Sequence, residues 1–191
     1  MDFEIEVTGT ANLLMHNGQL ANPLNPIVQE IKKITGKRKK TDDDHRKIAE
    51  LEHAGSLYLD PDVGPFMPGW SLHACLVNAA KKLKKGKTVT EGLFITTDVN
   101  PLGYSGPRDP AGLFEDKNFV HLWPVKVGTA RTMRCRPQFR EWKFAADGWA
   151  DPGLLDFADL QEIANIAGSY IGLCDWRPRY GRFSAKVKKK K

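Results

Sequence analysis

Strand patterns and helix patterns follow one another along this chain in an order that few folds accommodate. Near the N-terminus, Phe3, Ile5 and Val7 alternate with polar residues, and this period of two predicts a half-buried strand. From Ser71 to Leu83, apolar residues recur at helical spacing, which predicts an amphipathic helix capped by Ser71. The later patterns predict strands at 92–97, 125–136 and 139–145, a helix at 156–171 and a strand at 180–187.

A helical insertion at 22–54 interrupts this order after the first strand. Asn25 and Pro26 are typical of a helix start, Gly36 of a helix end, and Thr41 begins a second helix with the spacing of a capping box. Reduced to its core, the order is strand, helix, strand, strand, helix, strand. We therefore expect 1–191 to form a single α+β domain with a ferredoxin-like (RRM-like) βαββαβ core, the helical insertion at 22–54 and a basic β-hairpin at 125–146.

The composition indicates an intracellular protein with an acidic partner. Lys and Arg number 29 against 23 Asp and Glu, and the resulting charge of +6 favours partners such as nucleic acid. Three cysteines, Cys75, Cys135 and Cys174, form no CxxC pair, so neither a disulfide framework nor structural zinc is predicted, and no cofactor is expected. The N-terminus lacks the features of a signal peptide, and no apolar stretch approaches the roughly 20 residues of a membrane span. We expect a cytoplasmic protein that does not contact a membrane.

The strongest local signal is the sequence WRPRYGRF at 176–183, in which three arginines stand among three aromatic residues. Guanidinium groups pair with phosphates at any physiological pH, and aromatic rings stack on bases, so this composition is typical of single-strand binding. The alternative is a core strand with Phe183 buried and its arginines solvated or salt-bridged. The candidate binding residues are Trp176, Arg177, Arg179, Tyr180 and Arg182.

Two further basic regions are candidates. In the expected hairpin, Arg134 and Arg136 would share a face with Lys126 and form a finger that clasps a strand, although an ordinary polar face fits the pattern equally well. The connection between the two inserted helices would track a phosphate backbone, or serve only as a solvated helix end. The residues concerned are Arg131, Arg134, Arg136 and Arg140 in the hairpin region, and Lys37, Arg38, Lys39 and Lys40 in the connection.

Short motifs resemble those of a known family. Gly64–Leu72, with the sequence GPFMPGWSL, resembles the PGSSL turn that opens the first helix of the RAMP proteins, the backbone subunits of CRISPR effector complexes. Arg177–Phe183 resembles the G-R-x-G-R-F ending that leads into their last strand, and the βαββαβ order is similar. RAMP proteins usually carry a glycine-rich stretch ahead of that strand, where Gly172–Trp176 of this chain has a single glycine. Leu14–Leu20 and the overall layout are similar to small phage-encoded proteins of unassigned function.

The RAMP resemblance implies a shared fold, binding of a nucleic-acid strand and stacking of subunits into filaments. We therefore expect a non-enzymatic subunit that binds single-stranded DNA or RNA and self-associates, in the host cytoplasm if it is phage-encoded. Two alternatives are a structural phage protein that contacts acidic subunits and a metal-dependent nuclease with His16 or His73 as the base. The five histidines form no HExxH motif, and P-loop and GxGxxG motifs are absent, so no catalytic or metal-binding residue is predicted.

Overall fold

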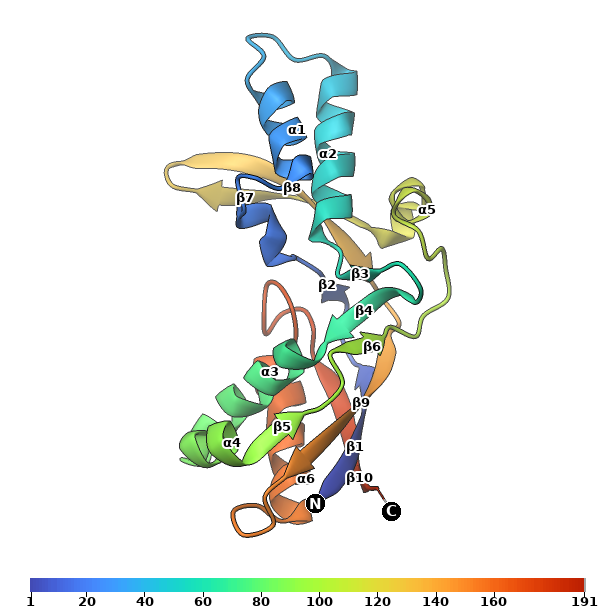
Figure 1. The fold of residues 1–191 in the computed structure, drawn as a ribbon. Coiled ribbons are helices and arrows are strands. Elements are labelled where there is room, and N and C mark those ends of the chain that lie inside the picture. The colour runs from blue at the N-terminus through green and yellow to red at the C-terminus, as the bar shows by residue number, and fades with distance from the viewer. Residues whose placement is uncertain (191) are drawn as a thin grey trace. The chain divides into compact units, whose positions relative to one another are not determined.

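The computed structural model describes residues 1–190, apart from the side chain of Val127 (Figure 1). Helices and antiparallel strands both contribute, which confirms the predicted α+β class. The described residues divide into two compact units. The first comprises residues 1–13, 59–105 and 140–190, and the second comprises residues 14–58 and 106–139.

A four-stranded antiparallel sheet is the frame of the first unit. The strand order is β10-β1-β9-β5, and every neighbouring pair is antiparallel. Phe3, Ile5 and Val7 are buried in β1, as the alternating pattern predicted, because they face the core while the residues between them face outward. The bounds are β1 (Asp2–Gly9), β5 (Leu93–Ile95), β9 (Lys143–Ala150) and β10 (Phe183–Lys189).

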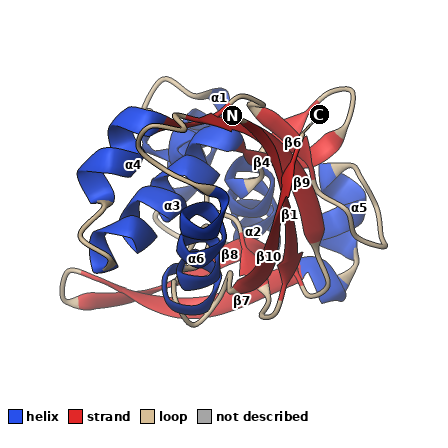
Figure 2. Cartoon of the chain, turned by 90° about the horizontal axis from the view of Figure 1, so that it is seen from below, coloured by secondary structure: helices blue, strands red, loops and turns tan. Residues whose placement is uncertain are grey.

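Helices cover one face of this sheet (Figure 2). They are α3 (Gly69–Lys82), α4 (Gly86–Gly92) and α6 (Phe157–Ile166), and a π-helical turn (Ala167–Ile171) extends α6. The predicted apolar stripe of α3 is buried, since Leu72, Cys75, Leu76 and Ala79 are at most 2% exposed. A small sheet of order β3-β4-β6 leads into α3, and its strands are β3 (Leu59–Asp60), β4 (Gly64–Pro68) and β6 (Val99–Pro101).

The start of α3 differs from the prediction. The helix begins at Gly69, and Ser71 does not cap it, because Pro68 occupies the N-cap position. A Cβ atom on Gly69 would lie 2.3 Å from the carbonyl oxygen of Thr97, so the glycine permits this close entry into the helix. The preceding residues, expected to be a turn, pair with β3 and β6 as β4.

Both predicted helices of the insertion are present in the second unit. In α1 (Pro26–Thr35) the Asn25 side chain accepts a hydrogen bond from the Ile27 backbone N–H, and Pro26 is the first helical residue. In α2 (Asp42–Ser56), Thr41 and Asp44 form the reciprocal capping box. The two helices pack against each other, and α2 also packs on the strand β8. The shorter helices of this unit are η1 (Gly18–Ala21), α5 (Pro110–Glu115) and η2 (Lys117–Phe119).

The hairpin of the second unit is displaced from its predicted position at 125–146. Its strands are β7 (Val120–Val127) and β8 (Ala130–Phe139), and the short β2 (Leu13–Leu14) lies on the other side of β8. The turn falls at Gly128, whose φ of +61° suits a tight reversal, whereas Pro137 lies within β8 opposite Val120. Residues 143–150, expected to be the second hairpin strand, instead join the sheet of the first unit as β9.

Candidate nucleic-acid interface

The WRPRYGRF segment lies mostly in a closed loop, and we call residues 173–182 the arginine loop. At its base, the Leu173 N–H donates to the Gly181 carbonyl oxygen at 2.9 Å, and the Gly181 N–H donates to the Asn12 carbonyl oxygen at 2.7 Å. Gly181 has a φ of +72°, and a Cβ atom there would lie 1.9 Å from the Leu173 carbonyl oxygen. This conformation is incompatible with a strand, so the predicted strand start at Tyr180 is wrong and β10 begins at Phe183.

Sulfur contacts fix the first half of the loop within its unit. The Cys75 Sγ lies 3.3 Å from the Gly172 carbonyl oxygen, and the Cys174 Sγ lies 3.9 Å from the Met67 Sδ. Burial raises the pKa of Cys75 and of Cys174 to about 12, and the nearby charge of Arg177 opposes this shift only partly. Both thiols are therefore protonated at neutral pH and are poor nucleophiles. Their contacts are those of structural cysteines.

An aromatic pair occupies the loop. The Trp176 and Tyr180 rings stack with centroids 5.5 Å apart and an interplanar angle of 30°, and Trp176 is 38% exposed. Cys174 and Trp176 have φ values of +61° and +57°, a region that costs a non-glycine residue about 1–3 kcal/mol. The hydrogen bonds and sulfur contacts at the loop base hold a conformation that the chain alone disfavours. The pair is thereby held in place before any ligand binds.

The three arginines of the loop are exposed. Within residues 1–190, no carboxylate forms an ion pair with Arg177, Arg179 or Arg182. Three cations that form no ion pair in residues 1–190 therefore flank the aromatic pair in the sequence, and Asp175 is the one carboxylate of the loop. Of the alternative, the buried Phe183 and the solvated arginines are observed, whereas the strand does not extend over residues 176–182 and no ion pair to these arginines is formed in residues 1–190.

Arg140 lies at the end of the first unit where the arginine loop is anchored. The Arg182 carbonyl oxygen accepts hydrogen bonds from the N–H groups of Thr10 and Ala11 at 2.8 and 3.2 Å. The Trp142 Nε1 donates to the Ala11 carbonyl oxygen at 2.9 Å, which brings the start of β9 to the same short segment. The exposed Arg140, two residues before Trp142, thus lies at the end of the sheet where the arginine loop begins and ends.

The hairpin arginines have a different environment. Arg134 forms an ion pair with Glu52, a buried carboxylate that also accepts a hydrogen bond from the Cys135 N–H at 3.0 Å. Its charge is therefore compensated within the second unit. The expectation that Arg134 and Arg136 share a face with Lys126 is wrong: with the turn at Gly128, Lys126 pairs with Arg131 on the opposite face. Arg131 is exposed near the tip.

An exposed ring on the hairpin was not anticipated from the sequence. Trp123 is 51% exposed, lies opposite Arg134 in the register, and stacks with His121 at a centroid distance of 6.1 Å. The alternating pattern of residues 120–127 could have indicated a strand with Trp123 on one face. The predicted strand began at residue 125 and therefore excluded Trp123.

The basic connection between α1 and α2 is only partly available for a ligand. Lys37 pairs with Asp44 at 2.6 Å, and the Lys40 Nζ donates to the Lys37 carbonyl oxygen at 3.2 Å. Arg38 and Lys39 are exposed. Two of the four cations therefore stabilise the connection itself.

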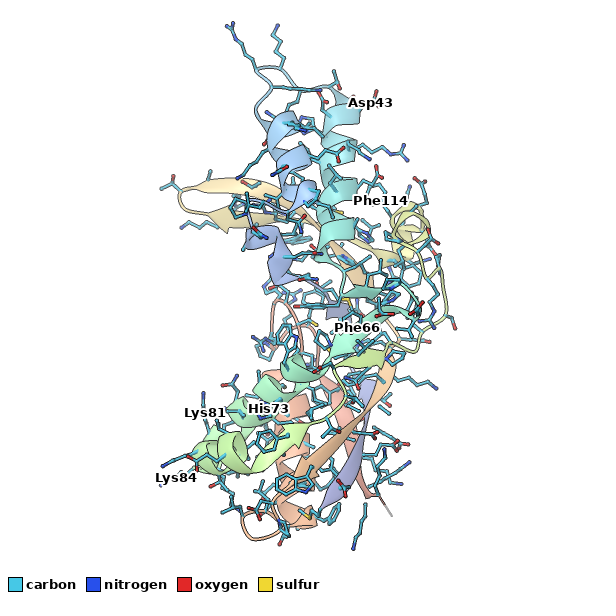
Figure 3. The ribbon with its side chains drawn as sticks, in the orientation of Figure 1. Asp43, Phe66, His73, Lys81, Lys84 and Phe114 are labelled. Atoms are coloured by element: carbon cyan, nitrogen blue, oxygen red, sulfur yellow. The ribbon has the colours of Figure 1, made fainter. Side chains whose placement is uncertain are left out.

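The histidines predicted as alternative catalytic bases do not form a recognisable centre. His16 is exposed, with its Nδ1 3.5 Å from the Ser56 Oγ, too long for a strong hydrogen bond. His73 lies on α3 together with Lys81 (Figure 3). In the described part of the chain, no three His, Cys, Asp or Glu side chains are grouped as metal ligands. The helices of residues 1–190 include none with the length and apolar character of a membrane span.

Comparison with known proteins gives no assignment. No protein-family model matches the chain, and no curated protein matches its sequence. The similarity to RAMP proteins remains a prediction.

Proposed function

We propose that this protein is a non-enzymatic subunit that binds single-stranded DNA or RNA through the arginine loop and assembles along the strand. The observation that carries the proposal is a loop closed by hydrogen bonds in which three exposed arginines, which form no ion pair in residues 1–190, flank a stacked Trp176–Tyr180 pair in the sequence. Guanidinium groups suit phosphates because of their planar donor geometry, and the rings suit bases of any sequence.

We further propose that the first unit has a ferredoxin-like core. Its elements β1, α3, β5, β9, α6 and β10 follow the order βαββαβ, and their sheet order corresponds to 4-1-3-2 in core numbering. The second unit is then an elaboration built from two insertions, one after β1 and one before β9. This fold supports the nucleic-acid proposal only by analogy, because a shared fold does not prove a shared ligand.

Salt dependence and paired variants test the binding site. Fluorescence anisotropy with labelled single-stranded DNA, single-stranded RNA and duplex should show tighter binding to single strands and a steep loss of affinity with salt. Arg179→Ala should reduce the slope of log affinity against log salt by about 0.7, because one phosphate contact is lost. Tyr180→Ala should cost about 1–3 kcal/mol of binding free energy with little change in slope.

Lys186→Gln is the control, since it removes a cation from β10, away from the arginine loop. Circular dichroism must show that each variant is folded. If Arg179→Ala and Tyr180→Ala both bind like the parent protein, the arginine loop is not the site. Affinity that is flat between low and physiological salt would instead favour a role in contacting acidic protein subunits.

Light scattering tests assembly separately from binding. Non-specific single-strand binders commonly bind cooperatively, so a strand of about 30 nucleotides or more should produce oligomers. Light scattering that reports a monomer both with and without such a strand would remove the assembly part of the proposal and leave the binding part intact.

A further inference from the structure

A second aromatic and basic surface lies on α3 in the first unit. Trp70 is 60% exposed, and Ala74, Val77 and Lys81 follow it at i+4, i+7 and i+11, which places all four on one side of the helix. This side is opposite the buried stripe of α3. Lys84 follows directly after the helix end, and Figure 3 shows His73, Lys81 and Lys84 along α3 and the turn beyond it.

Tyr170 extends this surface from the π-helical turn. Its ring is 66% exposed, and the Lys82 Nζ lies 6.0 Å from the ring centroid. Lysines at a helix C-terminus are expected from the helix dipole alone. The dipole does not account for two large aromatic side chains that are mostly exposed, Trp70 at the start of α3 and Tyr170 beside the side chain of its last residue, and an exposed ring is what a base stacks on.

The lysines of this surface are not neutralised. The sequence of α3 contains no Asp or Glu. Lys81 donates to the Asn78 side-chain amide at 3.0 Å, and in the described chain no carboxylate pairs with Lys81, Lys82 or Lys84. The neighbouring lysines differ, since Lys85 pairs with Asp159 and Lys87 with Glu91.

The helix α3 lies next to the base of the arginine loop. The π-helical turn packs along α3, and the Cys75 Sγ contacts the Gly172 carbonyl oxygen at the point where the turn passes into the loop. From Trp70 to Lys81 the helix rises about 16 Å at 1.5 Å per residue. A stacked strand with about 3.4 Å between phosphates covers this length with about five nucleotides.

We infer that the nucleic-acid path runs from the arginine loop over the outer face of α3, where Trp70 and Tyr170 contact bases and Lys81, Lys82 and Lys84 contact phosphates of single-stranded DNA or RNA. This inference rests on the proposed function, and it extends the site by a surface that the sequence motifs did not indicate. It makes the length of the bound strand the decisive variable. A strand of about five nucleotides occupies the arginine loop alone, and one of about 15 reaches α3 as well.

The test compares oligothymidine and oligouridine of these two lengths. On the longer strands, the double variant Lys81→Gln/Lys84→Gln should lower affinity about tenfold and reduce the salt slope by about 1.4, because two phosphate contacts are lost. Tyr170→Ala should weaken the longer strands about tenfold with the slope unchanged, and Tyr170→Phe should restore binding because it keeps the ring. On the shorter strands, all three variants should bind like the parent.

The matched control is Lys186→Gln/Lys189→Gln, which makes the same charge change on β10 at two exposed lysines that form no ion pair in residues 1–190. If the α3 double variant binds the longer strands as this control does, the inference is overturned, and weaker binding of Arg179→Ala at both lengths still supports the proposed function. If the parent protein binds no strand of either length, both are overturned. The extended path is supported if the α3 variants, and not the control, lose affinity for the longer strands only.

Discussion

Replacement of Gly181 by alanine should destabilise the protein more than the same change at Gly128 or Gly18. Two costs combine, the backbone strain and the relief of a steric clash. Alanine at a φ of +72° is strained by about 1–2 kcal/mol. The new Cβ atom would lie 1.9 Å from the Leu173 carbonyl oxygen, which is backbone and cannot rotate away. Relieving this clash breaks the two backbone hydrogen bonds of Gly181, to Leu173 and to Asn12, worth about 1 kcal/mol each. The expected loss is about 3–4 kcal/mol.

The two comparison glycines separate these costs. Gly128 has a φ of +61° but nothing within 4 Å of an added Cβ atom, so Gly128→Ala should cost only the strain, about 1 kcal/mol. Gly18 is neither crowded nor at positive φ, and Gly18→Ala should be close to neutral. Urea denaturation followed by circular dichroism gives the three free energies of unfolding. A Gly181→Ala variant that is no less stable than Gly128→Ala would refute the idea that the loop base is rigid.

Two further predictions concern the second unit. Burial lowers the pKa of His53 below its usual 6.5, so below that pH the unfolded chain takes up a proton that the folded chain does not. The free energy of unfolding should fall by up to about 1.4 kcal/mol per pH unit from pH 6.5 downward in urea titrations, and His53→Gln should flatten this dependence; an unchanged dependence would contradict it. Glu52→Gln removes the ion pair to Arg134 and should lower the free energy of unfolding by about 1–3 kcal/mol. Glu115→Gln, from the exposed pair with Arg46, should change it little, and equal effects of the two variants would contradict the assigned role of Glu52.

Local signals predicted the elements of this fold better than their boundaries. The caps of α1 and α2 were predictable from the sequence because the Asn25 and Thr41 side chains accept hydrogen bonds from backbone N–H groups no more than three residues away. The start of α3 was misplaced because it depends on Gly69 fitting against Thr97, which lies in a distant part of the sequence. The hairpin was misplaced because the alternating pattern of 125–136 does not show that the chain reverses within it, at Gly128, which supplies the positive φ that the reversal needs.

The candidate site was predictable in composition and not in arrangement. The sequence identified the arginines and rings of the WRPRYGRF segment, but not that Gly181 closes them into a loop against Asn12, since that contact spans most of the chain. The sequence also indicated the hairpin arginines, as weaker candidates than those of the loop. The structure separates them, because Glu52 neutralises Arg134 from a helix 82 residues away in sequence.

The open face of the four-stranded sheet carries a different balance of charge. Residues of β1 that point away from the helices include Glu4 and Glu6, and Asp147 of β9 lies opposite Glu4. Two of the nearby lysines are engaged, since Lys188 pairs with Glu6 and Lys190 with Asp147. Phosphates approaching this face would meet carboxylates whose partners are already taken.

Binding across the open sheet face, as in RNA-binding proteins with an RRM domain, therefore fits this chain poorly, even though the rings of Phe94 and Trp149 stack there with centroids 6.1 Å apart. Trp149 lies opposite Asp2, so a base stacked on it would bring its phosphate toward a carboxylate. Within the described part of this unit, Lys143 and Lys186 also lack an acidic partner, but they share the sheet face with Glu4, Glu6 and Asp147. The unpaired cations of the arginine loop and α3 have a single carboxylate, Asp175, among them. A strand that avoids the acidic face and follows these cations is held at one end of the sheet and along a helix.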